Sequence, residues 1–434
     1  MKKFLVFLVS CIVAICLGMT FYYFVKDEEV IQIKTSTLYL NAGDSISLDE
    51  LGFSHTHKKS ETKINFNAGG ETVESIIKYD STLKKYVTTA QGGSTTIIIT
   101  TNNKKFAKFE INVVVGNGSA EAPFHISTEE ELFAIGTSKY DTTPDDDVNN
   151  ALTAHYELMN DITIADEHYA IGYNEDGGCE TFEGVFDGNY HTIKDLDIDS
   201  KSYGGLFAII GKNATVQDLY FEDARLVGSY DYVGTLAGVI NGYVDRVAIK
   251  NSNIQNAKVS TTTFTGGLAG KIVTDNDEIN NFGIASTVYR VSIENTSSSS
   301  RISGAHYVGG IAGEINCANI EAIKVDSKIK STATSGGYIG GFAGMLVLNN
   351  DFGFVRESYS LSTITLANDT GYKGALFGYI NAGDGSSINT DTVLLGLYFN
   401  KDNTNLTAYG STTAMLDLTT VAGKTTSELK TKNR

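Results

Sequence analysis

The stretch FDGNYHTIKDLDID carries the residues of this chain best suited to acid–base chemistry, which are Asp187, His191, Asp195, Asp197 and Asp199. Two or three convergent carboxylates would serve a glycan hydrolase or lyase, because one group donates a proton while another acts as base or nucleophile. In a strand, however, the last three aspartates share one face, which is typical of a solvated outer surface. We therefore expect a structural turn here, and the sequence predicts no catalytic residue.

Metal chemistry has equally weak support. His55 and His57 in HTHKKSE lack the second-turn partner of a His-Glu-x-x-His zinc motif, so we interpret them as loop residues. The acidic stretches YDTTPDDDVNN (140–150) and NEDGGCETFEG (174–184) do not have the ligand spacing of a calcium loop. We expect no metal and no cofactor.

The chain has four cysteines and no C-x-x-C pair, which gives no support to a structural zinc site. Cys11 and Cys16 lie in an apolar N-terminal segment. Cys179 and Cys317 follow no disulfide framework pattern; we favour two independent thiols, and one disulfide remains the alternative.

Composition limits the possible partners. A net charge of −17, without a clustered basic stretch, argues against a nucleic-acid partner. The 44 glycines and 2 prolines accompany many Thr, Ser, Asn, Ile, Val and Tyr residues, a mixture that favours strands and turns. A length of 434 residues predicts two or more domains.

The N-terminal segment predicts a membrane helix. Residues 4–25 are apolar or weakly polar and would span about 33 Å as a helix, enough for a hydrocarbon core of about 30 Å. Lys2 and Lys3 precede the segment, which places the bulk of the chain outside the cell. We expect residues 1–30 to be an uncleaved signal anchor; a lipoprotein signal at LVSC with Cys11, or a cleaved signal peptide, are the alternatives.

Residues 31–117 predict a small β-sandwich. IQIKTSTLYL alternates apolar and polar positions before the turn signal NAGDS, and GGSTTIIITTNNKKFAKFEINVVVG reads as two strands joined near Asn102–Lys104. The segment resembles bacterial immunoglobulin-like modules, which often end in a strand such as Val113 to Gly116. That resemblance implies a spacer that holds a distal domain away from the cell envelope.

The third predicted domain covers residues 118–434. It starts with a linker, NGSAEAPF, and a short helix in which Thr128 and Glu131 would form a capping box. Leu132, Phe133 and Ile135 would give this helix an apolar face that could cap the region that follows.

Six similar glycine-rich stretches recur in this third region: SYGGLFAII, YVGTLAGVI, FTGGLAGKI, YVGGIAGEI, YIGGFAGML and YKGALFGYI. Their first aligned glycines are Gly204, Gly234, Gly266, Gly309, Gly340 and Gly374. A unit of about thirty residues cannot bury its own apolar face, but stacked copies can. The repeats therefore predict a parallel β-helix.

We interpret each copy as one strand whose alternate residues lie on an inner face. In the fourth copy these residues are Tyr307, Gly309, Ile311, Gly313 and Ile315. The opposite face would then carry the variable or charged residues, which are Thr235, Lys271, Glu314 and Lys373. Glycines would serve as packing and corner residues between the large inner side chains. The longest interval between copies contains TDNDEINNFG, which we expect to be a loop insertion.

Together with the lead-in FEGVFDGNYHTIKDLDI (182–198) and the stretches FHISTEEELFAIG and YELMNDITI, these copies resemble the GLUG repeats of bacterial surface proteins. The resemblance covers roughly residues 124–430 and implies an exported, β-helical region of adhesin-like proteins. It transfers no catalytic residue.

We thus predict an all-β protein with an N-terminal transmembrane helix, an immunoglobulin-like β-sandwich and a parallel β-helix (β-solenoid). The expected function is a cell-surface adhesin-like protein that binds an extracellular glycan or protein without catalysis, anchored in the cytoplasmic membrane. A glycan-processing hydrolase or lyase is the alternative, and a purely structural display stalk is a second alternative.

Overall fold

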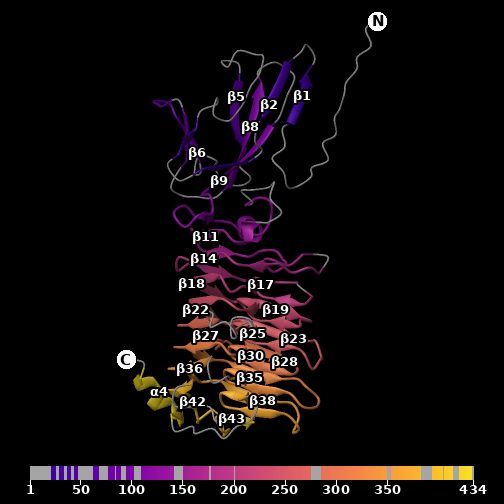
Figure 1. Ribbon diagram of the computed structural model, residues 1–434, viewed down its shortest axis with the longest axis vertical. Helices are drawn as coiled ribbons and strands as arrows, with labels where there is room; N and C mark the ends of the chain where they lie inside the picture. The colour runs from indigo at the N-terminus through magenta and orange to yellow at the C-terminus, as the bar shows by residue number, and fades with distance from the viewer. Residues whose placement is uncertain are drawn as a thin grey trace. The chain divides into compact units, whose positions relative to one another are not determined.

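The computed structural model divides the chain into two units, Met1–Met159 and Asn160–Arg434 (Figure 1). The structure describes residues 21–25, 29–33, 37–40, 44–46, 62–67, 77–83, 85–88, 94–101, 109–140, 150–174, 177–199, 201–274, 285–348, 353–382, 393–403, 405–413 and 420–432. Every structural statement below refers to these residues. Cys11, Cys16, His55 and His57 lie outside them.

The predicted transmembrane helix is wrong in the part of it that the structure describes. Strand β1 (Phe21–Val25) pairs in antiparallel fashion with β2 (Glu29–Ile33), so the end of the predicted membrane segment is extended. The sequence FYYFV consists of aromatic and β-branched residues, which favour a strand when a partner such as EVIQI is available. No helix among the described residues has the length and apolar character needed to cross a bilayer.

Two further sheets lie in the first unit. The strands are β3 (Thr37–Leu40), β4 (Ser45–Ile46), β5 (Thr62–Asn67), β6 (Ile77–Asp80), β7 (Lys85–Thr88), β8 (Ser94–Thr101) and β9 (Phe109–Val115). One sheet has the order β3-β9-β8-β5, and the other has the order β4-β7-β6. The predicted pairing of the IIITT and INVVV segments is confirmed, because β8 and β9 are antiparallel neighbours. The pair β3–β9 is parallel, so the sheet is mixed rather than purely antiparallel.

The capping box of the short helix is also confirmed. Helix α1 (Glu129–Phe133) begins after Thr128, whose Oγ1 accepts a hydrogen bond from the backbone N–H of Glu131 at 3.2 Å. The carboxylate of Glu131 in turn accepts the backbone N–H of Ser127 at 2.8 Å. The first unit also contains the parallel strands β10 (Phe124–Ile126) and β11 (His155–Leu158) and the 3-10 turn η3 (Asn150–Leu152).

The second unit is a parallel β-solenoid of about eight turns, in which strands of successive turns lie one above another (Figure 1). We name its four sheets for their main feature. The aromatic sheet consists of β16 (Tyr203–Gly204), β20 (Tyr232–Val233), β24 (Phe264–Thr265), β29 (Tyr307–Gly309), β34 (Tyr338–Gly340) and β39 (Tyr372–Gly374). The glycine sheet consists of β13 (Thr181–Phe182), β17 (Phe207–Ile210), β21 (Ala237–Ile240), β25 (Ala269–Val273), β30 (Ala312–Asn316), β35 (Ala343–Val347), β40 (Phe377–Asn381) and β43 (Tyr409–Thr412).

The other two sheets complete each turn. The polar sheet consists of β19 (Arg225–Gly228), β23 (Asn253–Asn256), β28 (Arg301–Gly304), β33 (Lys328–Ser331) and β38 (Thr363–Leu366). The kinked sheet consists of β12 (Ile162–Thr163), β14 (Val185–Asp187), β15 (Thr192–Lys194), β18 (Thr215–Glu222), β22 (Tyr243–Lys250), β26 (Thr287–Tyr289), β27 (Ser292–Glu294), β31 (Asn319–Glu321), β32 (Lys324–Asp326), β36 (Phe354–Arg356), β37 (Tyr359–Ser360), β41 (Leu394–Leu395), β42 (Leu397–Asn400) and β44 (Val421–Lys424). Helix α4 (Thr426–Lys432) follows the last strand.

The predicted repeat register is confirmed for the second to sixth copies, whereas in the first copy Gly204 pairs with Val233 instead of Gly234. Parallel pairing aligns Ala237 with Ala269, Ala269 with Ala312, and Ala312 with Ala343. Each of these alanines follows the first glycine of its copy by three residues, so the repeats seen in the sequence are equivalent positions of successive turns. The interior is apolar: Leu226, Ile254, Ile302 and Ile329, for example, form one buried column of the polar sheet.

The prediction that each glycine-rich copy is a single strand with an inward tyrosine is wrong. Each of the six copies forms two strands in different sheets, such as β29 and β30, and the chain changes direction between Gly309 and Ala312. The alternation is therefore interrupted. Val308 is buried, whereas Tyr307 lies partly exposed at the surface.

Thr235 also departs from its predicted position. It was expected on the outer face, but it is fully buried, at the place where the fourth copy has Gly310. A Cβ at Gly310 would lie 2.5 Å from Cγ1 of Val325, a core residue, which indicates that this position points into the interior.

Two glycine positions of each copy are required by close backbone approach. A Cβ at Gly309 would lie 2.0 Å from the carbonyl oxygen of Ala312 and 2.5 Å from Cα of Ala343, both of which are backbone atoms. A Cβ at Gly313 would meet the backbone of β24, a strand of the preceding turn. In the first copy, Ala208 occupies the position equivalent to Gly313. The aromatic sheet begins in that turn with β16, so among the described residues no earlier strand of the aromatic sheet lies against the Ala208 side chain.

The kinked sheet owes its name to one left-handed residue in each turn. Asp218, Arg246, Arg290, Ala322 and Glu357 have φ between 49° and 59°. These residues lie where β18 and β22 bend and where later turns divide into two strands, such as β26 and β27. The repeated bend brings side chains of neighbouring turns together on the outside of this sheet.

Candidate functional surfaces of the solenoid

The acidic residues singled out in the sequence do not converge. Asp187 accepts hydrogen bonds from the backbone N–H of Asn189 and from Nε2 of Gln217, both at 2.8 Å. His191 Nδ1 lies 3.3 Å from Asp161, and Asp197 receives Nη1 of Arg225 at 3.0 Å. Their neighbours Leu196 and Ile198 are buried, whereas Asp195, Asp197 and Asp199 are exposed or half-buried, so the predicted solvation of these aspartates is confirmed, although β15 ends at Lys194 and they do not lie on one strand.

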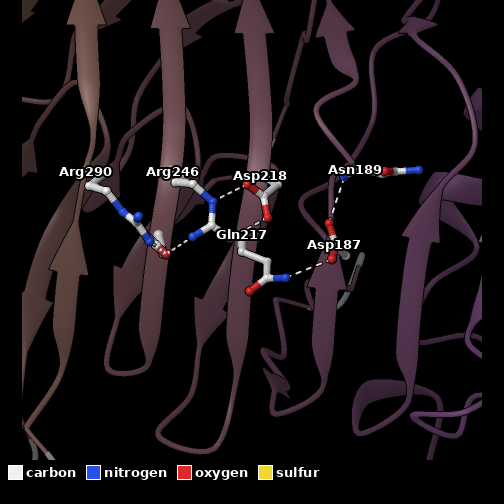
Figure 2. A network of polar contacts seen from close by, with 7 residues as sticks. Asp187, Asn189, Gln217, Asp218, Arg246 and Arg290 are labelled. Atoms are coloured by element: carbon white, nitrogen blue, oxygen red, sulfur yellow. Dashed lines mark hydrogen bonds and ion pairs between the residues drawn. The ribbon is translucent and has the colours of Figure 1, made fainter.

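A ladder of charged side chains crosses the kinked sheet from turn to turn (Figure 2). Arg246 contacts both carboxylate oxygens of Asp218, with Nη2 donating to Oδ2 at 2.5 Å, and it also contacts Asp245. Arg290 of the next turn holds the same Asp245 through two bonds, one of which joins Nε to Oδ1 at 2.8 Å. The side chains of Asp218 and Asp245 are 7% and 4% exposed, so the carboxylates are largely shielded from water, whereas Arg246 and Arg290 are 31% and 44% exposed.

These pairings fix the charge states of the ladder. The hydrogen bonds from Arg246 lower the pKa of Asp218, and the same bonds raise the pKa of Arg246. Asp245 likewise raises the pKa of Arg290 through its hydrogen bonds. A carboxylate held ionised by an arginine is a poor proton donor near neutral pH, so the ladder is suited to linking turns rather than to acid catalysis.

One carboxyl group has the opposite tendency. Burial raises the pKa of Asp326, and Glu294, its register partner in the preceding turn, adds to the effect. Lys324 donates from Nζ to Glu294 at 2.5 Å. Glu294 and Asp326 therefore lie side by side on adjacent strands, whose backbones are about 4.8 Å apart.

A stack of six aromatic rings runs along the aromatic sheet. Tyr203, Tyr232, Phe264, Tyr307, Tyr338 and Tyr372 follow one another with centroid distances of 5.3, 5.3, 4.7, 5.0 and 5.5 Å and interplanar angles between 3° and 20°. The strand spacing of about 4.8 Å is close to the stacking distance of aromatic rings, so in-register strands produce this ladder directly.

The aromatic ladder contacts the neighbouring glycine sheet. The Lys271 ammonium lies 5.6 Å from the centroid of Phe264, and the ring of Tyr379 lies 5.6 Å from that of Tyr338. We call this junction of the aromatic and glycine sheets the seam. The inner rings of the ladder cover each other's faces, so those faces are not open to a ligand. Sugars bind tyrosine through its face, so this arrangement does not favour sugar stacking along the ladder.

The polar sheet presents a different surface. Its two outward columns contain Arg225, Asn253, Arg301, Lys328 and Thr363 in one and Val227, Gln255, Ser303, Lys330 and Thr365 in the other. Four of these residues are cationic and none is acidic. Arg225, Arg301, Lys328 and Lys330 are all exposed, although the whole chain has a net charge of −17.

Both described cysteines are free thiols. Burial raises the pKa of the Cys179 thiol to about 11 and also raises that of Cys317. Neither thiol is therefore activated as a nucleophile. Among the described residues, no group of three or more histidine, cysteine, aspartate or glutamate side chains is arranged to hold a metal ion.

Sequence reasoning missed the charged columns of the polar sheet. The signal was present in the short segments RLVG, RISG and KIKS, each of which places a cation directly before a buried Leu or Ile. These cations are far apart in the sequence, and only the solenoid register brings them to one face.

Comparisons with known proteins find a similarity to a small part of one curated protein. A stretch of 175 residues, 37% of the chain, is 29% identical to Halomucin of Haloquadratum walsbyi, and the match covers 2% of that protein. No family model matches the chain. No solved structure matches it either.

Proposed function

We propose that this protein is an adhesin-like binding module that acts outside the bacterial cell and presents the lateral faces of its solenoid to an extracellular glycan or protein. The observation that carries the proposal is the contrast between inner and outer columns. In the polar sheet the inner column repeats Leu or Ile, while the outer column changes from Arg225 to Asn253, Arg301, Lys328 and Thr363. A constant core beneath a variable exposed face is the arrangement of a binding scaffold.

The charged ladder of the kinked sheet supports a non-catalytic role. Asp218 and Asp245 are each bound by arginine, and Asp187 is bound by an amide. The carboxylates that cross these turns are thus occupied by structural partners. A display stalk without a ligand would have the same ladder. Only a measurement of ligand binding distinguishes the adhesin-like module from the stalk.

The finer classification belongs to the same proposal. We assign the repeats to the GLUG type on the basis of the six glycine-rich copies, and residues 31–117 to an immunoglobulin-like module. The order β3-β9-β8-β5, with a parallel first pair, and the separate sheet β4-β7-β6 support the second assignment. The resemblance to bacterial surface proteins supports a location on the cell surface.

A binding screen with the purified full chain tests the proposed function. The chain is immobilised and exposed to an array of glycans and to extracellular matrix proteins, and release of reducing sugar from each polysaccharide is measured in parallel. We expect saturable binding to at least one ligand without turnover. Turnover of a polysaccharide would contradict a purely binding role, and a complete lack of binding would favour the display stalk.

A second candidate function is glycan cleavage at Asp326 and Glu294. The raised pKa of Asp326 makes it the described carboxyl group best suited to donate a proton, and Glu294 lies in register with it. If a polysaccharide is cleaved, Asp326→Asn should abolish turnover, whereas Asp199→Asn, at an exposed site, should leave it unchanged. Equal activity of the two variants would exclude this site.

A further inference from the structure

We infer that the polar sheet is the ligand-binding face and that its ligand is an anionic polysaccharide carrying carboxylate or sulfate groups. This inference rests on the proposed binding function and names the face and the chemical class. It starts from the basic cluster, which we define as Arg301, Lys328 and Lys330.

The basic cluster is formed by the solenoid register. Arg301 of β28 lies beside Lys328 of β33 in the adjacent turn, because Ile302 pairs with Ile329. Lys330 follows Lys328 by two residues and therefore points to the same side of the strand. In-register neighbours are about 4.8 Å apart and alternate residues of a strand about 7 Å apart, so the three charges lie within reach of one short anionic segment.

Within the part of the chain that the structure describes, the cations of the basic cluster form no ion pair with a carboxylate. Arg301 donates from Nη2 to the amide oxygen of Gln255 at 2.7 Å, and Lys328 donates to the backbone carbonyl of Ser297 at 3.0 Å. Arg225, at the other end of the sheet, is the cation of these columns that holds an aspartate, Asp197. The kinked sheet differs: Lys250 lies there between Glu222 and Glu294 in register.

The uncharged residues of the same columns favour a polysaccharide. Asn253, Gln255, Thr363 and Thr365 offer amide and hydroxyl groups that can hydrogen-bond to sugar hydroxyls beside the basic cluster. Sites for single-stranded nucleic acid use aromatic side chains to stack bases, and the ten residues of these two columns include none. They extend along five strands, or roughly 19 Å, which suits a linear polymer lying parallel to the solenoid axis.

The overall charge of the protein sharpens the specificity of this face. A net charge of −17 repels polyanions from most of the surface, so productive contact is confined to the place where positive charge is concentrated. Because the cations are exposed, attraction should weaken as the Debye length falls from about 10 Å at 0.1 M salt to about 3 Å at 1 M.

The test compares two variants of the full chain with equal changes in net charge. The first replaces the basic cluster through Arg301→Gln, Lys328→Gln and Lys330→Gln. The control carries Lys194→Gln, Lys250→Gln and Lys373→Gln, which remove three cations outside the polar sheet. Binding of polygalacturonate, dextran sulfate, neutral dextran and a thymidine oligonucleotide is measured by biolayer interferometry at low and high salt, and circular dichroism verifies that both variants fold.

We expect the unmodified chain to bind polygalacturonate, dextran sulfate or both in a salt-sensitive manner; the two probes distinguish carboxylate from sulfate as the recognised group. The basic-cluster variant should bind at least about tenfold more weakly, and the control should change less than about twofold. Equal losses in both variants would overturn the inference, as would preferential binding of the oligonucleotide or of neutral dextran.

The two proposals fail in different ways. If neither anionic polysaccharide binds but another glycan or a protein from the array does, the inference about the polar sheet is wrong and the proposed binding function stands. If nothing binds in either experiment, both are wrong.

Discussion

The seam and the polar sheet belong to the same turns of the solenoid but leave very different freedom to their residues. At the seam, backbone atoms of adjacent turns approach so closely that Gly309 has no space for a Cβ, and aromatic rings stack at about the strand spacing. In the polar sheet, by contrast, most of the outward side chains are exposed or half-buried, and they change from one turn to the next.

This difference shows how a repeat protein combines a fixed fold with a variable surface. The seam carries the recurring sequence that makes the repeats recognisable, because its geometry admits few residues. The polar sheet carries little recurring sequence on its outer columns, because its strands are held by the buried Leu and Ile column beneath. Variation is thus possible where contact with a ligand is possible.

The largest expected effect is a substitution at the seam. Gly309→Val places a branched side chain against the Ala312 carbonyl oxygen and the backbone of β35, neither of which can move independently of the sheet. We expect the free energy of unfolding to fall by about 4 kcal/mol or more, measured by urea denaturation. The control Thr363→Val, at an exposed site of the polar sheet, should change it by less than about 0.5 kcal/mol. A well-tolerated valine at residue 309 would mean that the seam is not closely packed.

The charged ladder should give the next largest effect. Arg246→Met leaves the shielded carboxylates of Asp218 and Asp245 without this partner, and we expect a clear fall in the free energy of unfolding, measured by urea denaturation. The matched change Arg301→Met removes an exposed arginine of the polar sheet and should cost less than about 0.5 kcal/mol. Similar losses in the two variants would remove the distinction between an arginine that pairs with shielded carboxylates and an exposed one.

The pH dependence of the ladder follows from the lowered pKa of Asp218. In the folded protein this group binds its proton less tightly than in the unfolded chain, so its contribution to stability is present above the ordinary carboxyl pKa of about 4. It is lost as the pH falls through the lowered pKa. The stability difference between the unmodified chain and Asp218→Asn should therefore be largest near pH 7 and shrink below about pH 4, as measured by urea denaturation at each pH. A difference that grows on acidification would have the wrong sign for this pair.

The aromatic ladder allows a comparison within the seam. Tyr307 stacks on Phe264 and on Tyr338, whereas Tyr372 lies at the end of the ladder and is 43% exposed. We expect Tyr307→Ala to lower the free energy of unfolding by about 2–3 kcal/mol and Tyr372→Ala by about 1 kcal/mol. Thermal denaturation followed by circular dichroism provides an independent ranking. If the terminal ring matters as much as the central one, stacking is not the source of the stabilisation.

The smallest expected effect on stability belongs to the polar sheet. Lys330→Gln should change the free energy of unfolding by less than about 0.5 kcal/mol, because its ammonium group is exposed at a site where the buried neighbour Ile329 provides the packing. The same variant should weaken polysaccharide binding measurably. A large loss of stability would show that this lysine has a structural role and would remove the contrast between the two surfaces.

The sequence was sufficient to predict the repeat register of the solenoid but not the face on which its side chains lie. The small residues around Gly309 and Gly340 recur at nearly constant intervals because the seam requires them, and this made the turns visible. The outward position of the Tyr307 side chain could not be predicted. The prediction assumed one continuous strand with alternating inward and outward residues, but the chain bends between β29 and β30, which interrupts this alternation. The membrane helix was mispredicted because hydropathy alone does not reveal a strand partner such as Glu29–Ile33 for residues 21–25.

The candidate site was less predictable still. Asp187 and Asp197 could be recognised as surface residues, but their partners Gln217 and Arg225 come from the next turn and depend on the register of strands. Charges that meet through register, rather than through a contiguous motif, have no local signal in one sequence. The exposed cations of the polar sheet are missed for the same reason.

The corner that joins the glycine sheet to the kinked sheet shows how the architecture tolerates insertions. The chain between Val273 and Thr287 is much longer than the equivalent connection between Asn316 and Asn319, yet Val273 pairs with Asn316 and Thr287 with Asn319 in unbroken register. Extra length is accommodated at this corner without shifting the strands on either side. The corner is therefore a suitable place for grafting a foreign peptide, such as an epitope or an affinity tag, onto a rigid carrier.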